Sequence, residues 1–92
     1  MIFTDRGRFQ IEFPNGCKVS VFIGYGSYSS NKFNLNLIDP IDIVSCQNCE
    51  VAVIKDGKFV TDKFIDCEGD VCGFVEPKKL AEIIYNVSKY IA

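Results

Sequence analysis

Four of the five cysteines in this chain of 92 residues form two closely spaced pairs. Cys46 and Cys49 have the C-x2-C spacing, and Cys67 and Cys72 follow as a C-x4-C pair. Thiolates are preferred ligands of structural zinc, and two such pairs separated by a hairpin are typical of zinc ribbons. A turn at Asp56-Gly57 would place Cys46 opposite Cys67 and bring both pairs to one end of that hairpin. The four cysteines are therefore a candidate metal site.

Two other interpretations of the cysteine pairs stay open. Free cysteine is among the residue types most often buried, so simple packing in the core explains these thiols without a ligand, and we favour it. A cross-strand disulfide between Cys46 and Cys67 is the other alternative, because the same register places them face to face. Only Cys72 is followed by the glycine that is usual in zinc-binding turns, so we expect no cofactor, with zinc as the alternative.

The complete absence of histidine limits the catalytic chemistry of the chain. Ser-His and Cys-His nucleophile pairs are excluded, as are histidine acid–base catalysis and histidine metal ligands. The sequence also contains no G-x-x-x-x-G-K-[ST] phosphate-binding loop. We therefore expect a protein that is not an enzyme.

A segment rich in tyrosine, serine, glycine and asparagine runs from Gly24 to Asn31. Tyrosine offers a large, stiff contact area at low entropic cost, and small polar residues around it adapt to a partner, as in antibody paratopes. The alternative is an ordinary connection with one tyrosine packed against the core. The candidate partner-binding residues are Tyr25, Ser27, Tyr28, Ser29 and Asn31.

Two adjacent lysines, Lys78 and Lys79, fall in the first turn of the predicted C-terminal helix. The helix dipole disfavours cations at that end, and a broken local rule can mark a site. Phosphate groups bind at helix N-termini, so the pair is a candidate anion-binding site. The alternative is two solvated lysines.

Alternating apolar and polar residues predict a β-hairpin across residues 8–23, with its turn at Pro14-Asn15-Gly16. A second hairpin is predicted from strands at 49–54 and 59–65, and another short strand at 33–37.

A helix should begin at Pro77, because its apolar residues recur at helical spacing: Leu80, Ile83, Ile84, Val87 and Ile91. Residues 1–92 are thus expected to form a single α+β domain. Its small antiparallel sheet would have about four to five strands, with one C-terminal helix packed on one face.

Charge and hydropathy restrict the partners and the compartment. Ten basic and twelve acidic side chains give a net charge of −2, which disfavours binding to duplex DNA. No segment approaches the ~18 continuous apolar residues of a membrane span, and the N-terminus lacks a signal-peptide pattern. We therefore expect a cytoplasmic protein with no membrane partner and with reduced cysteines.

Three motifs carry a resemblance to a known family. The first is the Asn-Gly turn before Val19-Ser20-Val21 with the G-x-G-x-Y loop that begins at Gly24. The second is the E-V-A strand and D-G turn from Glu50 to Gly57, and the third is the G-F-x-x-P-x-x-L helix start at Gly73. Across residues 9–88, apart from 32–45, the chain resembles a family of small uncharacterised phage proteins. The cysteine pairs are not part of that family's pattern.

The resemblance implies a phage or mobile-element protein in the cytoplasm of a bacterial host cell. Such proteins commonly bind and block a larger host protein, and inhibition of a CRISPR effector is one instance. We therefore expect a non-enzymatic inhibitor that acts by protein–protein interaction. The alternatives are a structural zinc-ribbon adaptor and a sponge for a nucleotide signal that uses Lys78 and Lys79.

Overall fold

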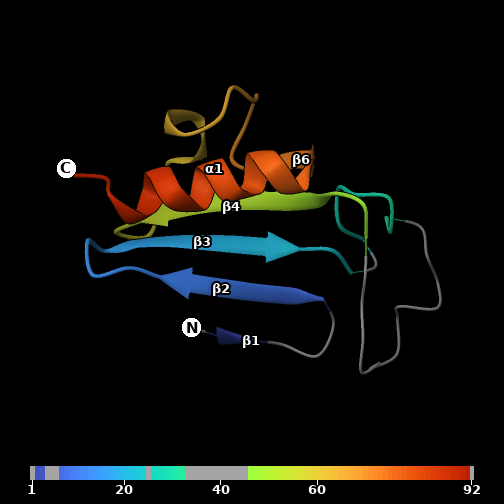
Figure 1. Cartoon of the computed structure of the whole chain (residues 1–92), viewed down its shortest axis with the longest axis horizontal. Coiled ribbons are helices and arrows are strands. Elements are labelled where there is room, and N and C mark those ends of the chain that lie inside the picture. Colours follow the sequence, from blue (N-terminus) through green and yellow to red (C-terminus); the bar gives the residue numbers. More distant parts are fainter. Residues whose placement is uncertain (1, 4–6, 25, 33–45, 92) are drawn as a thin grey trace.

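The computed structural model describes residues 2–3, 7–24, 26–32 and 46–91. Within these residues, six strands form one antiparallel sheet and a single α-helix, α1 (Pro77–Ser88), lies across it (Figure 1). Neighbouring strands follow the order β1-β2-β3-β4-β5, and β6 also pairs with β4. The predicted α+β fold is therefore confirmed. The strands are β1 (Ile2–Phe3), β2 (Arg8–Glu12), β3 (Cys17–Phe22), β4 (Cys49–Lys55), β5 (Lys58–Phe59) and β6 (Cys72–Val75).

The first hairpin joins β2 to β3 as predicted, and Ile11 lies opposite Val19. Its connection is a three-residue loop. The amide of Phe13 donates to the carbonyl of Cys17 over 2.8 Å, and the amide of Gly16 donates to the carbonyl of Phe13 over 3.0 Å. Gly16 has a φ of 87°, the conformation that this bulged turn requires and that glycine adopts without strain.

The second hairpin begins as predicted and then departs from the expected strand. Lys55 pairs with Lys58, and Asp56 and Gly57 both have positive φ, as in a type I′ turn. Strand β5, however, ends at Phe59 instead of continuing to residue 65, so that part of the prediction is wrong. The chain turns into a 3₁₀ helix at Thr61–Lys63.

The buried side chain of Thr61 explains why β5 stops. Its hydroxyl accepts a hydrogen bond from the amide of Val53 over 2.9 Å and donates one to the carbonyl of Asp70 over 2.7 Å. The Val53 amide therefore needs no strand partner at this position. The remaining edge of β4 pairs with β6, where Val51 lies opposite Cys72.

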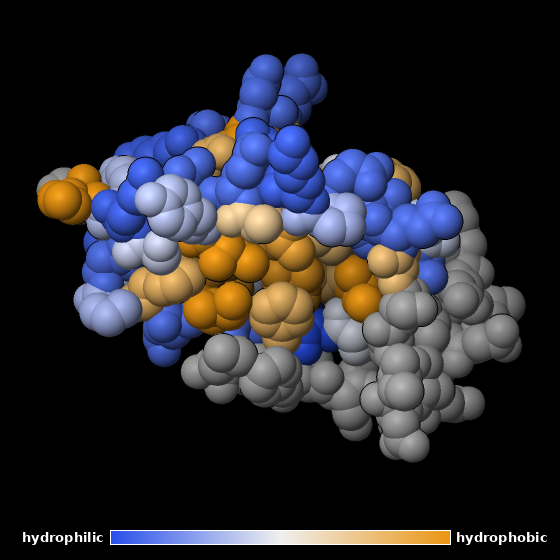
Figure 2. Space-filling model, viewed as in Figure 1, coloured by the Kyte–Doolittle hydropathy of each residue, from blue (hydrophilic) through white to orange (hydrophobic). Residues whose placement is uncertain are grey.

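Helix α1 packs over β3 and β4 and seals the core (Figure 1). Ile83 and Val87 are fully buried together with the strand valines, including Val19, Val51 and Val53. Figure 2 shows that hydrophobic side chains also remain visible on the sheet below the helix. The apolar stripe of the helix thus packs on the sheet, as its spacing predicts.

The end of the helix departs from that stripe. Helix α1 ends at Ser88, and Ile91 is 90% exposed, so its predicted place in the core is wrong. Tyr90 packs there instead, with its ring edge-on to Phe64 at a centroid distance of 5.3 Å. None of the described residues forms a helix long and apolar enough to cross a membrane.

Three strands differ from or extend the sequence-based expectations. The strand expected at 33–37 lies outside the described residues. The short strand β1 and the edge strand β6 were not predicted from the sequence. Strand β6 matters most, because it carries residues of the candidate site described below.

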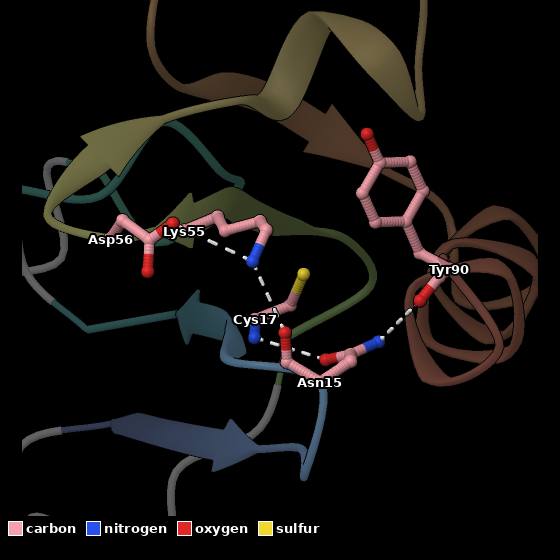
Figure 3. Close-up of polar contacts among 5 residues, drawn as sticks. All are labelled: Asn15, Cys17, Lys55, Asp56 and Tyr90. Carbon is pink, nitrogen blue, oxygen red and sulfur yellow. Dashed lines mark hydrogen bonds and ion pairs between the residues drawn. The ribbon is translucent and has the colours of Figure 1, made fainter. Parts of the chain in front are cut away.

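Asn15, in the first hairpin turn, links the sheet to the end of the helix through side-chain hydrogen bonds (Figure 3). Its side-chain amide donates to the carbonyls of Val87 and Tyr90 over 2.8 and 3.0 Å. Its side-chain oxygen accepts from the amide of Cys17 over 3.0 Å. The last carbonyls of a helix have no partner within the helix, and here a side chain from the far end of the sequence supplies one.

We predict that Asn15→Ala lowers the free energy of unfolding by about 1–3 kcal/mol. The Tyr90 carbonyl and the Cys17 amide lose their Asn15 partner, and the Val87 carbonyl keeps only backbone partners. Asn15→Asp keeps the acceptor for Cys17 but removes the donor, so it should also destabilise the fold. Asn86→Ala, an exposed change on α1, is the control. Urea denaturation measures all three, and wild-type stability of Asn15→Ala would contradict the capping role.

Candidate interaction surface and cysteine cluster

The loop at 24–32 is held in shape by its own polar side chains. The Ser27 hydroxyl donates to the carbonyl of Gly24 over 2.7 Å and lies 2.6 Å from the Ser29 hydroxyl. The Asn31 side-chain amide donates to the carbonyl of Ile23 over 2.7 Å. Serine and asparagine commonly satisfy loop backbone groups in this way.

Three of the five predicted partner-binding residues therefore face inward. Ser27, Ser29 and Asn31 are buried, so they shape the loop and do not offer their side chains to a partner. Tyr25 lies outside the described residues. Tyr28 is the predicted residue that the structure places on the surface, with 48% of its area exposed.

Contacts with β4 and β6 fix the position of Tyr28. Its carbonyl accepts a 2.7 Å hydrogen bond from the amide of Phe74. Its side chain lies so close to Gly73 that a Cβ atom at that glycine would be 2.6 Å from the Cβ of Tyr28. The ammonium group of Lys32 lies 4.4 Å from the centroid of the tyrosine ring. The ring is thus positioned before any partner arrives.

Phe74 is the residue of this surface that the sequence did not indicate. It lies where the β4–β6 register shifts, and its φ of 54° is in the left-handed region that a phenylalanine seldom adopts. Its side chain is 56% exposed. A β-bulge can re-aim a side chain, and here it presents an aromatic ring to solvent beside the backbone of Tyr28.

The two lysines of the candidate anion site are exposed at the start of α1. The ammonium group of Lys79 lies 3.3 Å from a carboxylate oxygen of Glu82, one turn along the helix. Such an exposed ion pair contributes little to the free energy of unfolding. It does place the negative charge of Glu82 beside the ammonium group that would bind an anion, which disfavours anion binding. The arrangement resembles a solvated helix surface.

The predicted pairing of Cys46 with Cys67 does not form in the described sheet. Because β5 ends at Phe59, the register that would place Cys46 opposite Cys67 does not continue that far. All five cysteines are free thiols, and Cys17 is buried in the core. In the part of the chain that the structure describes, no group of three or more Cys, Asp or Glu residues could hold a metal ion.

Hydrogen-bonding groups surround the Cys46 thiol, which itself donates to the side-chain oxygen of Asn48 over 4.0 Å. Burial alone raises the pKa of its thiol, but the amide of Asn48, the hydroxyl of Ser29 and further donors at Asn31 and Ser30 outweigh that effect and lower it. The Ser29 hydroxyl lies 3.5 Å from the Cys46 sulfur. A thiolate is the reactive form of cysteine, so this half-buried thiol is prepared for nucleophilic chemistry.

The neighbouring thiols behave in the opposite way. Burial, followed by the nearby charge of Cys46, raises the pKa of Cys49 to about 11. Burial, followed by a hydrogen bond and the charge of Cys67, raises the pKa of Cys72 to about 11. The charge of Cys49 also contributes to the raised pKa of Cys72.

We predict that iodoacetamide modifies Cys46 before Cys49 in the folded protein, because only Cys46 combines partial exposure with a lowered pKa. Ser29→Ala removes a hydrogen-bonding partner of the thiolate, so it should raise the pKa of Cys46. The midpoint of the pH dependence of Cys46 alkylation should then shift to higher pH, and alkylation at pH values below that midpoint should be slower. Ser88→Ala, which removes a remote helix hydroxyl, should leave the profile unchanged. Peptide mass spectrometry measures each site, and equal rates at Cys46 and Cys49 would contradict this assignment.

The comparisons with known proteins assign no family to this chain. No family model, curated protein or solved structure matches it.

Proposed function

We propose that this chain is a non-enzymatic binding protein that blocks a larger partner protein through a surface centred on Tyr28 and Phe74. The resemblance to phage proteins would make that partner a protein of the bacterial host, with a CRISPR effector as one instance. The zinc-ribbon and nucleotide-sponge alternatives depend on the cysteine pairs and on Lys78 and Lys79. Among the described residues, no group of three or more Cys, Asp or Glu side chains could hold a metal ion, and Lys79 is paired with Glu82.

The conformation of Phe74 is the observation that carries the proposal. A residue with a Cβ atom in the left-handed region costs roughly 1–2 kcal/mol, and glycine would remove that cost. The strain gains no buried contact for the ring, which is more than half exposed. Strained, exposed residues that the surrounding structure holds in place cluster at binding sites, where the strain is part of preorganisation.

The fixed position of Tyr28 supports the same reading. Binding costs free energy for each side chain that must be ordered, and a ring already held in place avoids much of that cost. Gly73 and Lys32 restrict this ring from two sides. Tyrosine and other aromatic residues are also frequent hot spots of protein interfaces. Tyr28 and Phe74 together offer two preordered aromatic groups on adjoining backbones.

The test begins by isolating the partner that co-purifies with tagged protein from host cells and measuring its affinity by calorimetry. We expect Tyr28→Ala and Phe74→Gly each to weaken binding by about 2 kcal/mol, roughly thirtyfold in Kd. Phe74→Gly should leave the thermal stability unchanged or raise it, because it relieves backbone strain. Stability and affinity therefore change independently, as a binding role requires.

Tyr85→Ala is the matched control for these variants. Tyr85 is also an exposed tyrosine under a lysine, with Lys89 at 4.3 Å from its ring, but it lies on α1. It should bind like wild type. Gly73→Ala keeps both rings but displaces Tyr28, so it should lose affinity as well. Full affinity in both Tyr28→Ala and Phe74→Gly would refute the proposed surface.

A further inference from the structure

Asn15 is followed by Gly16, and this pair is the one Asn-Gly step in the sequence. Asparagine is chemically labile, and it deamidates most readily before glycine, which has no side chain to keep its backbone nitrogen from the asparagine side chain. In a flexible chain the reaction converts asparagine to aspartate and isoaspartate. The folded protein holds this step in a defined set of contacts, so the rate of the reaction depends on the structure.

The folded turn engages both reacting groups in other hydrogen bonds. The side-chain nitrogen of Asn15, which is the leaving group, donates to the carbonyls of Val87 and Tyr90 at the end of α1 over 2.8 and 3.0 Å. The amide of Gly16, which is the nucleophile, donates to the carbonyl of Phe13 over 3.0 Å. Ring closure requires these bonds to break, so the docked end of the helix protects Asn15.

A lysine on β4 favours the same reaction electrostatically. The ammonium group of Lys55 donates to the backbone carbonyl of Asn15 over 3.2 Å (Figure 3). That carbonyl and the Gly16 nitrogen belong to one peptide group, so negative charge on the nitrogen is shared with the oxygen. A cation at the oxygen therefore stabilises the deprotonated, nucleophilic form of the peptide. The exposed carboxylate of Asp56 lies 3.6 Å from the same ammonium group and offsets part of its charge.

We propose that Asn15 is a self-modification site that the docking of α1 controls. When the end of the helix opens, the Gly16 nitrogen gives its proton to hydroxide and attacks the side-chain carbon Cγ of Asn15. A C–N bond forms, the bond from Cγ to Nδ2 breaks, and Nδ2 takes a proton from water and leaves as ammonia. Water then adds to one of the two carbonyls of the resulting succinimide and breaks the C–N bond of that carbonyl. The product is aspartate or isoaspartate at position 15.

The product does not restore the contact with the helix. A carboxylate has no donor for the carbonyls of Val87 and Tyr90, which accept from Asn15 in the unmodified chain. It also places negative charge at the end of a helix, where the dipole is already negative. Isoaspartate further adds a methylene group to the backbone of the turn. One opening of the helix end is thus converted into a lasting loss of its cap.

The test incubates the folded chain at mildly alkaline pH and follows deamidation of Asn15 by peptide mass spectrometry. We expect wild type to react roughly tenfold more slowly than the same protein in guanidinium chloride, because the open state is a minor one. Tyr90→Ala removes the ring that packs against Phe64, so it should raise the rate in the folded protein roughly three- to tenfold. Phe64→Ala, which removes the other ring of the pair, replaces Tyr90→Ala if that variant does not fold.

Variants of Lys55 test the activation of the nucleophile in the Tyr90→Ala background. Lys55→Met should slow deamidation roughly fivefold, the factor expected for two unit charges this close in water. Lys55→Arg keeps the positive charge and should react like the lysine. Lys79→Met removes an exposed lysine from the first turn of α1 and should leave the rate unchanged. An unchanged rate in Lys55→Met would contradict the activating role of the lysine.

Val51→Ala separates opening of the helix end from unfolding of the whole chain, because Val51 is fully buried in the sheet. At urea concentrations that give both variants the same free energy of unfolding, Tyr90→Ala should deamidate faster than Val51→Ala. Equal rates would overturn the proposal, since the reaction would then proceed through global unfolding. Deamidated wild type that unfolds at the same urea concentration as the intact protein would also overturn it, since the carboxylate would then fit the docked helix.

Discussion

The hydroxyl of Thr61 imposes the constraint on which one edge of the sheet depends. By satisfying the amide of Val53, it ends β5 after two residues and leaves the rest of that edge of β4 to β6. Three features of β6 depend on this pairing. They are the bulge that exposes Phe74, the hydrogen bond from its amide to the carbonyl of Tyr28, and the position of Cys72. One buried hydrogen bond between a side chain and the backbone thus decides which segment completes the sheet.

Local sequence signals predicted the elements whose partners are close in sequence. Turn chemistry and alternation located both hairpins, and helical spacing located α1. The errors arose where a distant partner overrode the local pattern. The apolar residues at 59–65 suggest a strand, but Thr61 redirects them, and the helical spacing that includes Ile91 extends past the point where the chain is capped by Asn15. Local sequence patterns predict neither interaction, because each joins residues that are distant in the sequence.

The candidate site was harder to predict, because composition does not distinguish a residue that builds a loop from one that the loop displays. Ser27 and Ser29 share the paratope-like composition of Tyr28, yet their hydroxyls point into the loop and bond to each other. Phe74 gave no signal, since a phenylalanine between Gly73 and Val75 suggests an ordinary buried strand position. Only the register shift between β4 and β6 exposes it. Paired cysteines were recognisable by spacing, but whether Cys46 lies opposite Cys67 depended on where β5 ends.

The cap formed by Asn15 has a consequence for how the chain is made. Its hydrogen bond to Val87 joins residues 72 positions apart in the sequence. Contacts of such high sequence separation require a large loop to close, which slows folding relative to a bundle of local contacts. All six described strands precede α1 in the sequence, so the sheet is synthesised before the helix that covers it. Until α1 is made, the buried valines of the sheet lack the covering side chains of Ile83 and Val87.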